Sequence, residues 1–190
     1  MSGHEHVHHH ADWRAALEAK RADEAHYYEH QFDWRGHGPP PEFHGPRFFP
    51  PAEAWRREAW LDTAAPGTGD AVQLPTSTGK LRDMTVAGQL VFDVDGAEQR
   101  LTLFLGHGRD GQPYGFVPFR DTTSGHETYG SGRYLDLDYD PAAPTYLLDF
   151  NTAYNPSCAF SPAYDCPYPP PGNRLDVRVE AGEMVPFEHA

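Results

Sequence analysis

Apolar and polar residues alternate along much of the chain after residue 70. The alternation is clearest from Val86 to Val94, and it resumes at Leu101 after Asp95-Gly96, a dipeptide that favours a tight turn. This pattern predicts a β-hairpin. Similar short segments predict further strands at residues 114–119, 133–139, 145–150 and 175–180. Their spacing is typical of an antiparallel β-sandwich or a small β-barrel, so a mainly β fold is expected.

Helical periodicity is confined to the N-terminal part of the chain. Between Asp12 and about Gln31, Trp13, Leu17 and Tyr28 fall near one face, and Asp12 is a suitable N-cap, which predicts one helix. Residues 1–10 hold five His and almost nothing apolar, so they are expected to form a disordered tail that binds divalent metals weakly at most. The remaining residues, 11–190, are predicted to form a single globular domain, with a turn and then a strand at 52–61.

Composition narrows the possible partners and the cellular location. The 190-residue chain has 18 Gly and 19 Pro, which favours many turns. Its formal net charge of −13 makes it an acidic protein whose field repels nucleic acid and anionic membranes, so neither is expected as a partner. No apolar run is long enough for a signal sequence or a membrane span, which predicts a cytoplasmic protein.

The segment FRDTTSGHETYGSGRYLDL, residues 119–137, gathers charged side chains around three glycines. Guanidinium groups bind carboxylates and other anions bidentately, so Arg120 and Arg133 are candidates for holding an anionic ligand. Asp121, His126 and Glu127 are candidate acid/base catalysts. The alternative is that both arginines are structural and neutralise neighbouring acids such as Asp121.

The segment DFNTAYNPSCAFSPAYDCPYPPPGNRL, residues 149–175, is a long Pro/Tyr-rich loop that follows a predicted strand. Its asparagines suit turns, and its tyrosines offer the amphipathic surface that often lines ligand pockets. Together the two segments give a set of ligand-binding candidates: Arg120, Arg133, Tyr129, Tyr134, Asp149, Asn151, Tyr154, Asn155 and Asn173.

Two cysteines lie in the second segment. Cys158 and Cys166 are separated by seven residues, which does not match the close cysteine pairs of structural zinc sites. They could be packed thiols, a disulfide or metal ligands, or Cys158 could be a catalytic nucleophile activated by His126, Asp121 or Glu127.

The two segments, in this order and at this separation, resemble the family named domain of unknown function 1684, and the likeness extends from Trp13 to Glu183. Two departures are visible: Gly38-Pro39-Pro40 stands where the family has Ser-Pro-Leu, and Phe160 stands where it has Tyr. The resemblance implies no catalytic assignment, because the family has none.

These patterns favour a domain that binds a small anionic or polar molecule in a pocket between loops 120–136 and 149–173, with hydrolase or transferase activity as an extension. Two alternatives belong to other classes. One is a non-enzymatic protein-interaction module that presents the Pro/Tyr-rich loop, and the other is a metal-binding protein that uses Cys158, Cys166 and His126. The residues specify neither a cofactor nor an oligomeric state.

Overall fold

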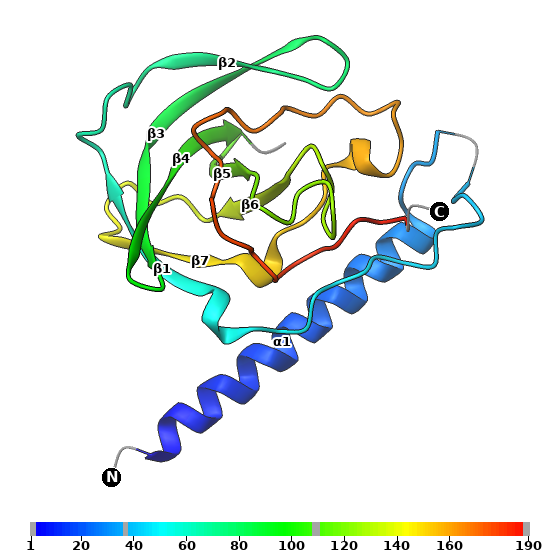
Figure 1. Cartoon of the computed structure of the whole chain (residues 1–190), viewed down its shortest axis with the longest axis horizontal. Helices are drawn as coiled ribbons and strands as arrows, with labels where there is room; N and C mark the ends of the chain where they lie inside the picture. Colours follow the sequence, from blue (N-terminus) through cyan, green and yellow to red (C-terminus); the bar gives the residue numbers. More distant parts are fainter. Residues whose placement is uncertain (1–2, 36–37, 108–110, 188–190) are drawn as a thin grey trace.

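The computed structural model describes residues 3–35, 38–107 and 111–187, with side chains from Asp12 onward. Within these ranges one antiparallel sheet curls into a half-barrel, and helix α1 (Gly3–His30) runs along its lower side in Figure 1. The predicted mainly β fold is confirmed. The strands are β1 (Arg56–Asp62), β2 (Ala71–Pro75), β3 (Leu81–Val94), β4 (Ala97–His107), β5 (Pro113–Phe119), β6 (Arg133–Leu137) and β7 (Thr145–Asp149). Their order is β6-β5-β4-β3-β1-β7, and β2 pairs with β3 outside this path.

The hairpin of β3 and β4 confirms the prediction and sets the curvature of the sheet. Asp95 and Gly96, at φ values of 54° and 82°, form the turn. Further along, the register shifts between Val86 and Gly88, which is a β-bulge. A Cβ on Gly88 would lie 2.7 Å from the Asp62 carbonyl oxygen, so only glycine fits here, where β3 pairs with β1.

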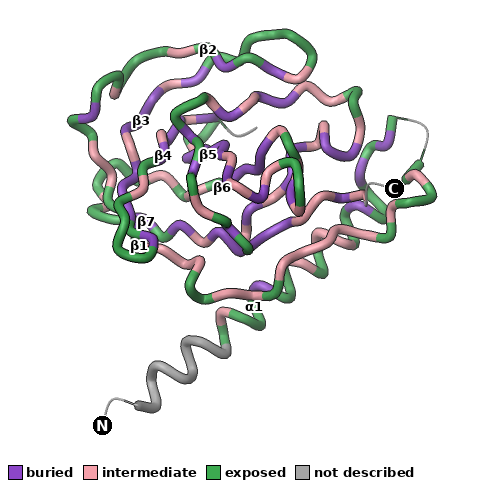
Figure 2. Tube along the Cα trace, viewed as in Figure 1, coloured by how far each residue is buried: buried purple, intermediate pink, exposed green. Residues whose placement is uncertain are grey.

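The buried side chains form three clusters, and the purple stretches of Figure 2 follow them along the chain. The largest cluster takes residues from β1 and from β3 to β7, including Leu103 and Phe150. A second cluster lies between the other side of the sheet and the Pro/Tyr-rich loop, and it contains Phe116 and Cys166. β4, β5 and β6 supply both clusters by alternation, whereas in β3 the bulge moves the even-numbered side chains from the second cluster to the first.

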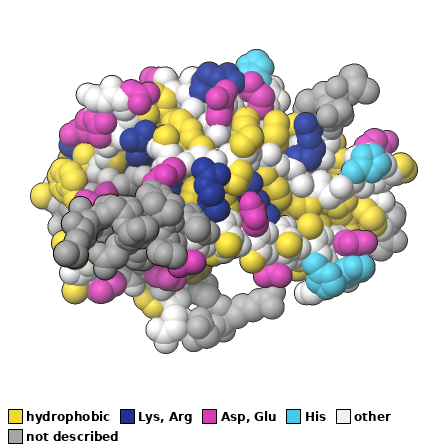
Figure 3. All heavy atoms as spheres, turned by 90° about the horizontal axis from the view of Figure 1, so that it is seen from below, with side chains coloured by type: hydrophobic (Ala, Val, Ile, Leu, Met, Phe, Trp, Pro, Cys, Tyr) yellow, Lys and Arg dark blue, Asp and Glu magenta, His cyan; other side chains and the backbone are white. Residues whose placement is uncertain are grey.

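Helix α1 is attached to the body by polar contacts along its length and by aromatic packing at its end. The Trp13 indole Nε1 donates to Asp149 Oδ2 at 2.8 Å, and Arg21 Nη1 donates to the Phe49 carbonyl oxygen at 3.0 Å. At the C-terminal end, Tyr28 stacks on Phe160 with ring centroids 4.2 Å apart, within the third cluster. Figure 3 shows this face, on which apolar side chains are interspersed with basic and acidic ones rather than gathered in one patch.

The helix α1 ends at His30, one residue before the predicted end at Gln31. It begins at Gly3 rather than after Asp12, so Asp12 lies inside the helix and does not cap it. No helix breaker stands between Gly3 and Asp12, and an exposed helix can extend through such residues. Met1 and Ser2 and the side chains of residues 3–11 lie outside the described part, so the tail at 1–10 stays a prediction. Among the described residues, no helix combines the length and apolar character that crossing a membrane requires.

Residues 53–62 confirm the predicted turn and strand, with a short 3-10 helix, η1 (Glu53–Trp55), leading directly into β1. The strand predicted at 175–180 is wrong. Leu175 and Val179 are buried as the alternation indicates, but this segment makes single contacts instead of a ladder. Its backbone N–H groups bond to the Arg120 carbonyl and to the Asp121 carboxylate. Alternation reports burial on one side, and here a side-chain acceptor replaces a neighbouring strand.

Candidate functional site

Arg133, the first residue of β6, lies in the interior with 1% of its surface exposed. Its Nη2 donates to Asp121 Oδ2 at 2.8 Å and to the Val179 carbonyl at 3.0 Å. Its Nη1 donates to the carbonyl oxygens of Ala181 and Glu183. Burial lowers the pKa of Arg133, and the Asp121 carboxylate opposes that change. The guanidinium is enclosed by the protein's own acceptors, which favours the structural interpretation of this residue.

Asp121 is the other half of this buried ion pair. Its Oδ1 accepts from the backbone N–H and the hydroxyl of Thr123, while Oδ2 accepts from Arg133 and from the Val179 N–H at 3.2 Å. The side chain is 1% exposed. Both oxygens are engaged in fixing the loop and the C-terminal segment, so the carboxylate has no free face for acid/base work.

The asparagines tie distant segments of the backbone together. Asn151 accepts from the Ala52 N–H and donates to the Ala52 carbonyl, each at 2.8 Å. Asn173 accepts from the Thr102 N–H at 2.8 Å and donates to the carbonyls of Thr102 and Pro118. Each of these side-chain amides supplies both a donor and an acceptor, so it satisfies a backbone N–H and a backbone carbonyl that no neighbouring strand pairs with.

The remaining ligand-binding candidates of the long loop, and Tyr134 of β6, are also engaged in hydrogen bonds within the protein. Asp149 Oδ2 accepts from Arg56 Nε at 3.1 Å as well as from Trp13, and Asn155 Nδ2 donates to the Met184 carbonyl at 2.7 Å. The Tyr134 hydroxyl donates to the Pro167 carbonyl, and the Tyr154 hydroxyl donates to Asp136 at 2.9 Å. Tyr134 and Tyr154 bridge β6 to the loop.

Three candidates of the first segment lie nearer to solvent. Glu127 is paired with Arg178, whose hydrogen bond lowers the pKa of the carboxyl group, and His126 is exposed beside it. Arg120 is half-buried, and its Cγ lies near Gly132, where Pro169 also packs. Its Nε is buried without a hydrogen-bond partner among the described residues. Arg120 is therefore the cation of this segment that the described residues leave without an acceptor.

The structure brings the two cysteines together at the junction of the two segments. Cys158 lies in the 3-10 helix η3 (Ser157–Ala159), and its backbone N–H donates to the Cys166 sulfur at 3.3 Å. The Tyr129 hydroxyl lies 3.9 Å from the Cys158 sulfur. Neither cysteine forms a disulfide in this structure; Cys166 is buried, whereas Cys158 is partly exposed. A partly exposed cysteine whose sulfur has a polar neighbour is thus present between loops 120–136 and 149–173.

The environment of the two thiols separates their acidities. A hydrogen bond from Cys166 lowers the pKa of Cys158 to about 6, helped by the hydroxyl of Tyr129, although partial burial opposes the change. The pKa of Cys166 is raised, because Cys166 donates to the ionised partner and is buried. The two thiols titrate as a pair, of which Cys158 is the more readily ionised member.

The groups that lower the pKa of Cys158 are Cys166 and Tyr129 rather than Asp121, His126 or Glu127, and Ser77 positions Cys166. Ser77 comes from the turn after β2, where its hydroxyl accepts from the Cys166 N–H at 3.1 Å and donates to the Tyr164 carbonyl at 3.0 Å. Sequence reasoning missed Ser77, because a serine in a Thr-Ser-Thr-Gly turn carries no signal of its contact 89 residues away. Among the side chains that the structure describes, no three His, Cys, Asp or Glu are grouped as metal ligands.

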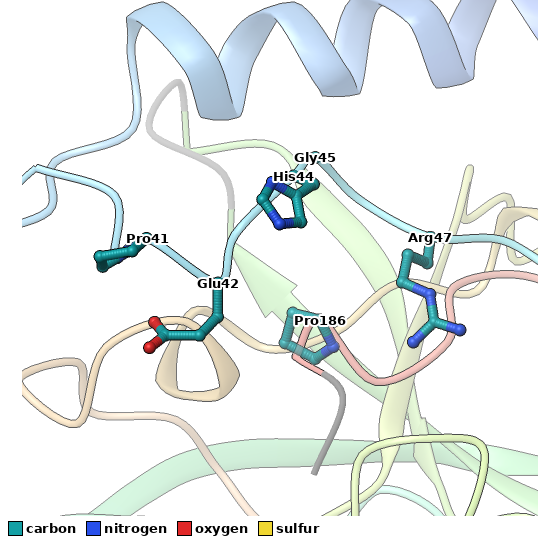
Figure 4. Close-up of a pocket in the computed structure, with 6 residues that line it drawn as sticks. All are labelled: Pro41, Glu42, His44, Gly45, Arg47 and Pro186. Carbon is teal, nitrogen blue, oxygen red and sulfur yellow. The ribbon is translucent and has the colours of Figure 1, made fainter. Parts of the chain in front are cut away.

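Two hollows in the described surface lie apart from the thiols. One, of about 550 Å³, is formed by the segment before β1 and the C-terminal Pro186, with Glu42, His44 and Arg47 around it (Figure 4). The other, of about 370 Å³, lies at the seam between β6 and β7 and includes Asp149 in its wall. Of the predicted site residues, Asp149 is the one that lines either of these two hollows.

Comparison with known proteins places the chain. The sequence profile of the family described as "Protein of unknown function (DUF1684)" matches residues 41–184. The chain belongs to this family. An uncharacterised protein of Haloarcula marismortui, from gene locus rrnAC0354 and solved by NMR in solution, is 34% identical to it with a TM-score of 0.68. That likeness covers 96% of this chain and 99% of the other. No curated protein matches. The family resemblance drawn from the two motifs is confirmed, and the DUF1684 match includes Tyr129, Cys158 and Cys166.

Proposed function

We propose that this DUF1684 domain binds a small polar or anionic molecule beside Cys158 and transfers or hydrolyses an acyl group by way of the Cys158 thiolate. The observation that carries the proposal is the meeting of Cys158, a partly exposed residue, with the Tyr129 hydroxyl and the buried Cys166. A stabilised thiolate is the form in which cysteine acts as a nucleophile, and hydrogen-bond donors around sulfur provide that stabilisation.

The anionic part of the ligand would be held by Arg120. Its buried Nε has no acceptor among the described residues, and its Cγ lies beside Gly132, where Pro169 of the other loop also lies. Tyr129 belongs to the same stretch, because the Gly132 N–H donates to the Tyr129 carbonyl at 2.9 Å. A guanidinium binds a carboxylate or phosphate through a planar pair of N–H groups, which gives the site its expected preference for anions.

In the proposed reaction the Cys158 sulfur attacks the carbonyl carbon of the bound molecule. The C–S bond forms as the bond to the leaving group breaks, and the leaving group departs with the electron pair of that bond. The Tyr129 hydroxyl, 3.9 Å from the sulfur, is placed to donate a hydrogen bond to oxygen atoms that gain charge in this step. Water or a second nucleophile then cleaves the thioester and regenerates the thiolate.

The other two functions considered from the sequence receive less support from the geometry. Among the described residues, the large apolar side chains that are most exposed are Tyr27, Trp60, Leu81 and Leu147, and all four lie outside the Pro/Tyr-rich loop. A protein-binding surface on that loop would present its aromatic residues instead. His126 is not grouped with the cysteines as a metal site would require.

The test is acylation by p-nitrophenyl acetate. Wild-type protein should release p-nitrophenolate and gain one acetyl group on Cys158, seen by mass spectrometry of the intact protein and its peptides. The rate should rise with pH around a midpoint near 6, following ionisation of the thiol. Cys158→Ser should abolish the acetylation, while Glu98→Gln, an exposed variant on β4, should leave it unchanged.

Anion recognition is tested separately with an acyl donor that carries a carboxylate, such as mono-p-nitrophenyl succinate. Arg120→Met should slow acylation by this anionic donor about tenfold, the effect of losing one charge-assisted hydrogen bond, and should leave the neutral acetate donor unaffected. Acylation at lysines alone, or equal rates in wild type and Cys158→Ser, would end the proposal.

A further inference from the structure

The second thiol of the site has no role in the proposed acyl chemistry. Cys166 is buried in the second core cluster, with its N–H held by Ser77 and its sulfur accepting from the Cys158 N–H at 3.3 Å. Cys158, in contrast, is partly exposed. The arrangement is that of a partly exposed cysteine with a second, buried cysteine beside it. Such a pair suits two-step oxidation, in which one sulfur meets the oxidant and the other displaces the product.

We infer that Cys158 and Cys166 form a modification site for hydroperoxides, at which oxidation closes a disulfide and thereby switches off the thiolate. The inference concerns regulation of the proposed site and rests on the nucleophilicity of Cys158, but it does not require that the acyl chemistry occurs. The occupant of the site is defined chemically: hydrogen peroxide or a small alkyl hydroperoxide, which needs no binding group beyond access to the sulfur.

The oxidation balances with the peroxide as the oxidant. The Cys158 thiolate attacks one peroxide oxygen, the O–O bond breaks, and Cys158 becomes a sulfenic acid while an alkoxide or hydroxide leaves with the electron pair. The Cys166 sulfur then attacks the Cys158 sulfur, a water molecule leaves, and the S–S bond forms. The peroxide has gained two electrons, the two thiols have lost them, and a small-molecule dithiol such as dithiothreitol reverses the change by exchange.

The surroundings support closure within one chain. The seven residues between the cysteines return the backbone to the same place, and Ser77 fixes this return through its contacts with the Cys166 N–H and the Tyr164 carbonyl. Phe160, two residues after Cys158, is held against Tyr28 of α1. Both ends of the short loop are therefore anchored, so the thiols remain next to each other while Cys158 passes through the sulfenic acid.

The experiment treats reduced full-length protein with hydrogen peroxide and follows it by intact mass and peptide mapping under non-reducing conditions. Wild type should lose two hydrogens and yield a peptide pair that links Cys158 to Cys166, and dithiothreitol should restore the original mass. Cys166→Ser should instead accumulate a sulfenic acid on Cys158, trapped by dimedone at least tenfold more than in wild type. Cys158→Ser should give neither product.

The outcomes separate this inference from the proposed function. If p-nitrophenyl acetate acylates Cys158 but peroxide gives no Cys158–Cys166 linkage, the inference is wrong and the acyl proposal stands. If the linkage forms although no donor acylates Cys158, the inference stands and the acyl proposal fails. Oxidation of wild type to a sulfinic acid, or to disulfides between two chains in place of the internal one, would also overturn it.

Discussion

The buried ion pair of Arg133 and Asp121 lies in the first family motif, residues 119–137. The thiol pair of Cys158 and Cys166 lies in the second, residues 149–175, and the environments of the two pairs are opposite. Around Arg133, carbonyl groups and a carboxylate take up the donors of the guanidinium, and the side chain is 1% exposed. Around Cys158, the donors are a neighbouring thiol and the Tyr129 hydroxyl, and the residue is partly exposed.

The contrast separates two reasons for a motif to be rich in polar residues. Where every polar atom is paired inside the protein, the group stabilises the fold, and removing one partner leaves an unpaired charge behind. Where a reactive atom is stabilised but still accessible, the group can do chemistry. The charged residues that first suggested a ligand site belong largely to the first class, and the cysteine pair belongs to the second.

The largest effect that sharpens this contrast is expected from Arg133→Ala. The substitution leaves Asp121 as a buried carboxylate without its counter-ion, and the carbonyls of Val179 and Glu183 lose their donors. Breaking such a pair costs about 3–5 kcal/mol in free energy of unfolding. Urea denaturation measures the loss. Arg178→Ala, which removes an exposed arginine that also faces acids, is the control and should change stability little. Similar small losses in both variants would contradict the structural assignment.

An intermediate effect on the free energy of unfolding is expected at Glu183, which lies beside Arg133. Its carboxyl oxygen Oε1 is buried and has no hydrogen-bond partner among the described residues. Burial raises its pKa to about 8 in the folded protein, against 4.5 for the free side chain. The folded state therefore holds a proton that the unfolded state releases, so the stabilisation is complete below pH 4.5 and is lost as pH rises towards 8. Stability should fall by up to about 1.4 kcal/mol per pH unit across this range.

Glu183→Gln tests this pH dependence directly. The amide oxygen can still accept from the Asn155 N–H, and its NH2 group can donate where the carboxylate could not. The variant should show a flatter profile of unfolding free energy against pH, and it should be more stable than wild type above pH 8. An unchanged slope in denaturation curves taken from pH 5 to pH 8 would show that another group binds the proton.

The smallest effect on stability, but a specific one on reactivity, is expected from Tyr129→Phe. The variant keeps the ring and removes the hydroxyl that lies 3.9 Å from the Cys158 sulfur. The pKa of Cys158 should rise from about 6, since one of the donors to its thiolate is lost. Iodoacetamide alkylation measured as a function of pH should show the midpoint moving upward, while urea denaturation changes by less than about 1.5 kcal/mol. A midpoint that stays in place would remove Tyr129 from the site.

Sequence patterns predicted the fold more completely than the site. The alternation from Val86 to Leu105 and the Asp95-Gly96 turn gave the central hairpin, because period-two burial and a left-handed turn are local properties. The segment 175–180 alternates in the same way and is no strand, since its backbone bonds to the side chains of Asp121 and Arg133 as well as to the backbone of residues 120 and 122. Burial was predictable there, and the identity of the hydrogen-bond partner was not.

The sequence by itself determined the mainly β character, the N-terminal helix, the membership of the family and the two segments that meet around the thiols. Only the tertiary structure decided that Arg133 is enclosed by the chain's own acceptors, that the buried Nε of Arg120 has none among the described residues, and that Ser77 and Tyr129 lie beside the cysteines. The physical reason is that saturation of a polar group depends on contacts between residues far apart in the sequence. Composition and spacing record which groups are present, whereas only the folded chain determines which of them remain free to react.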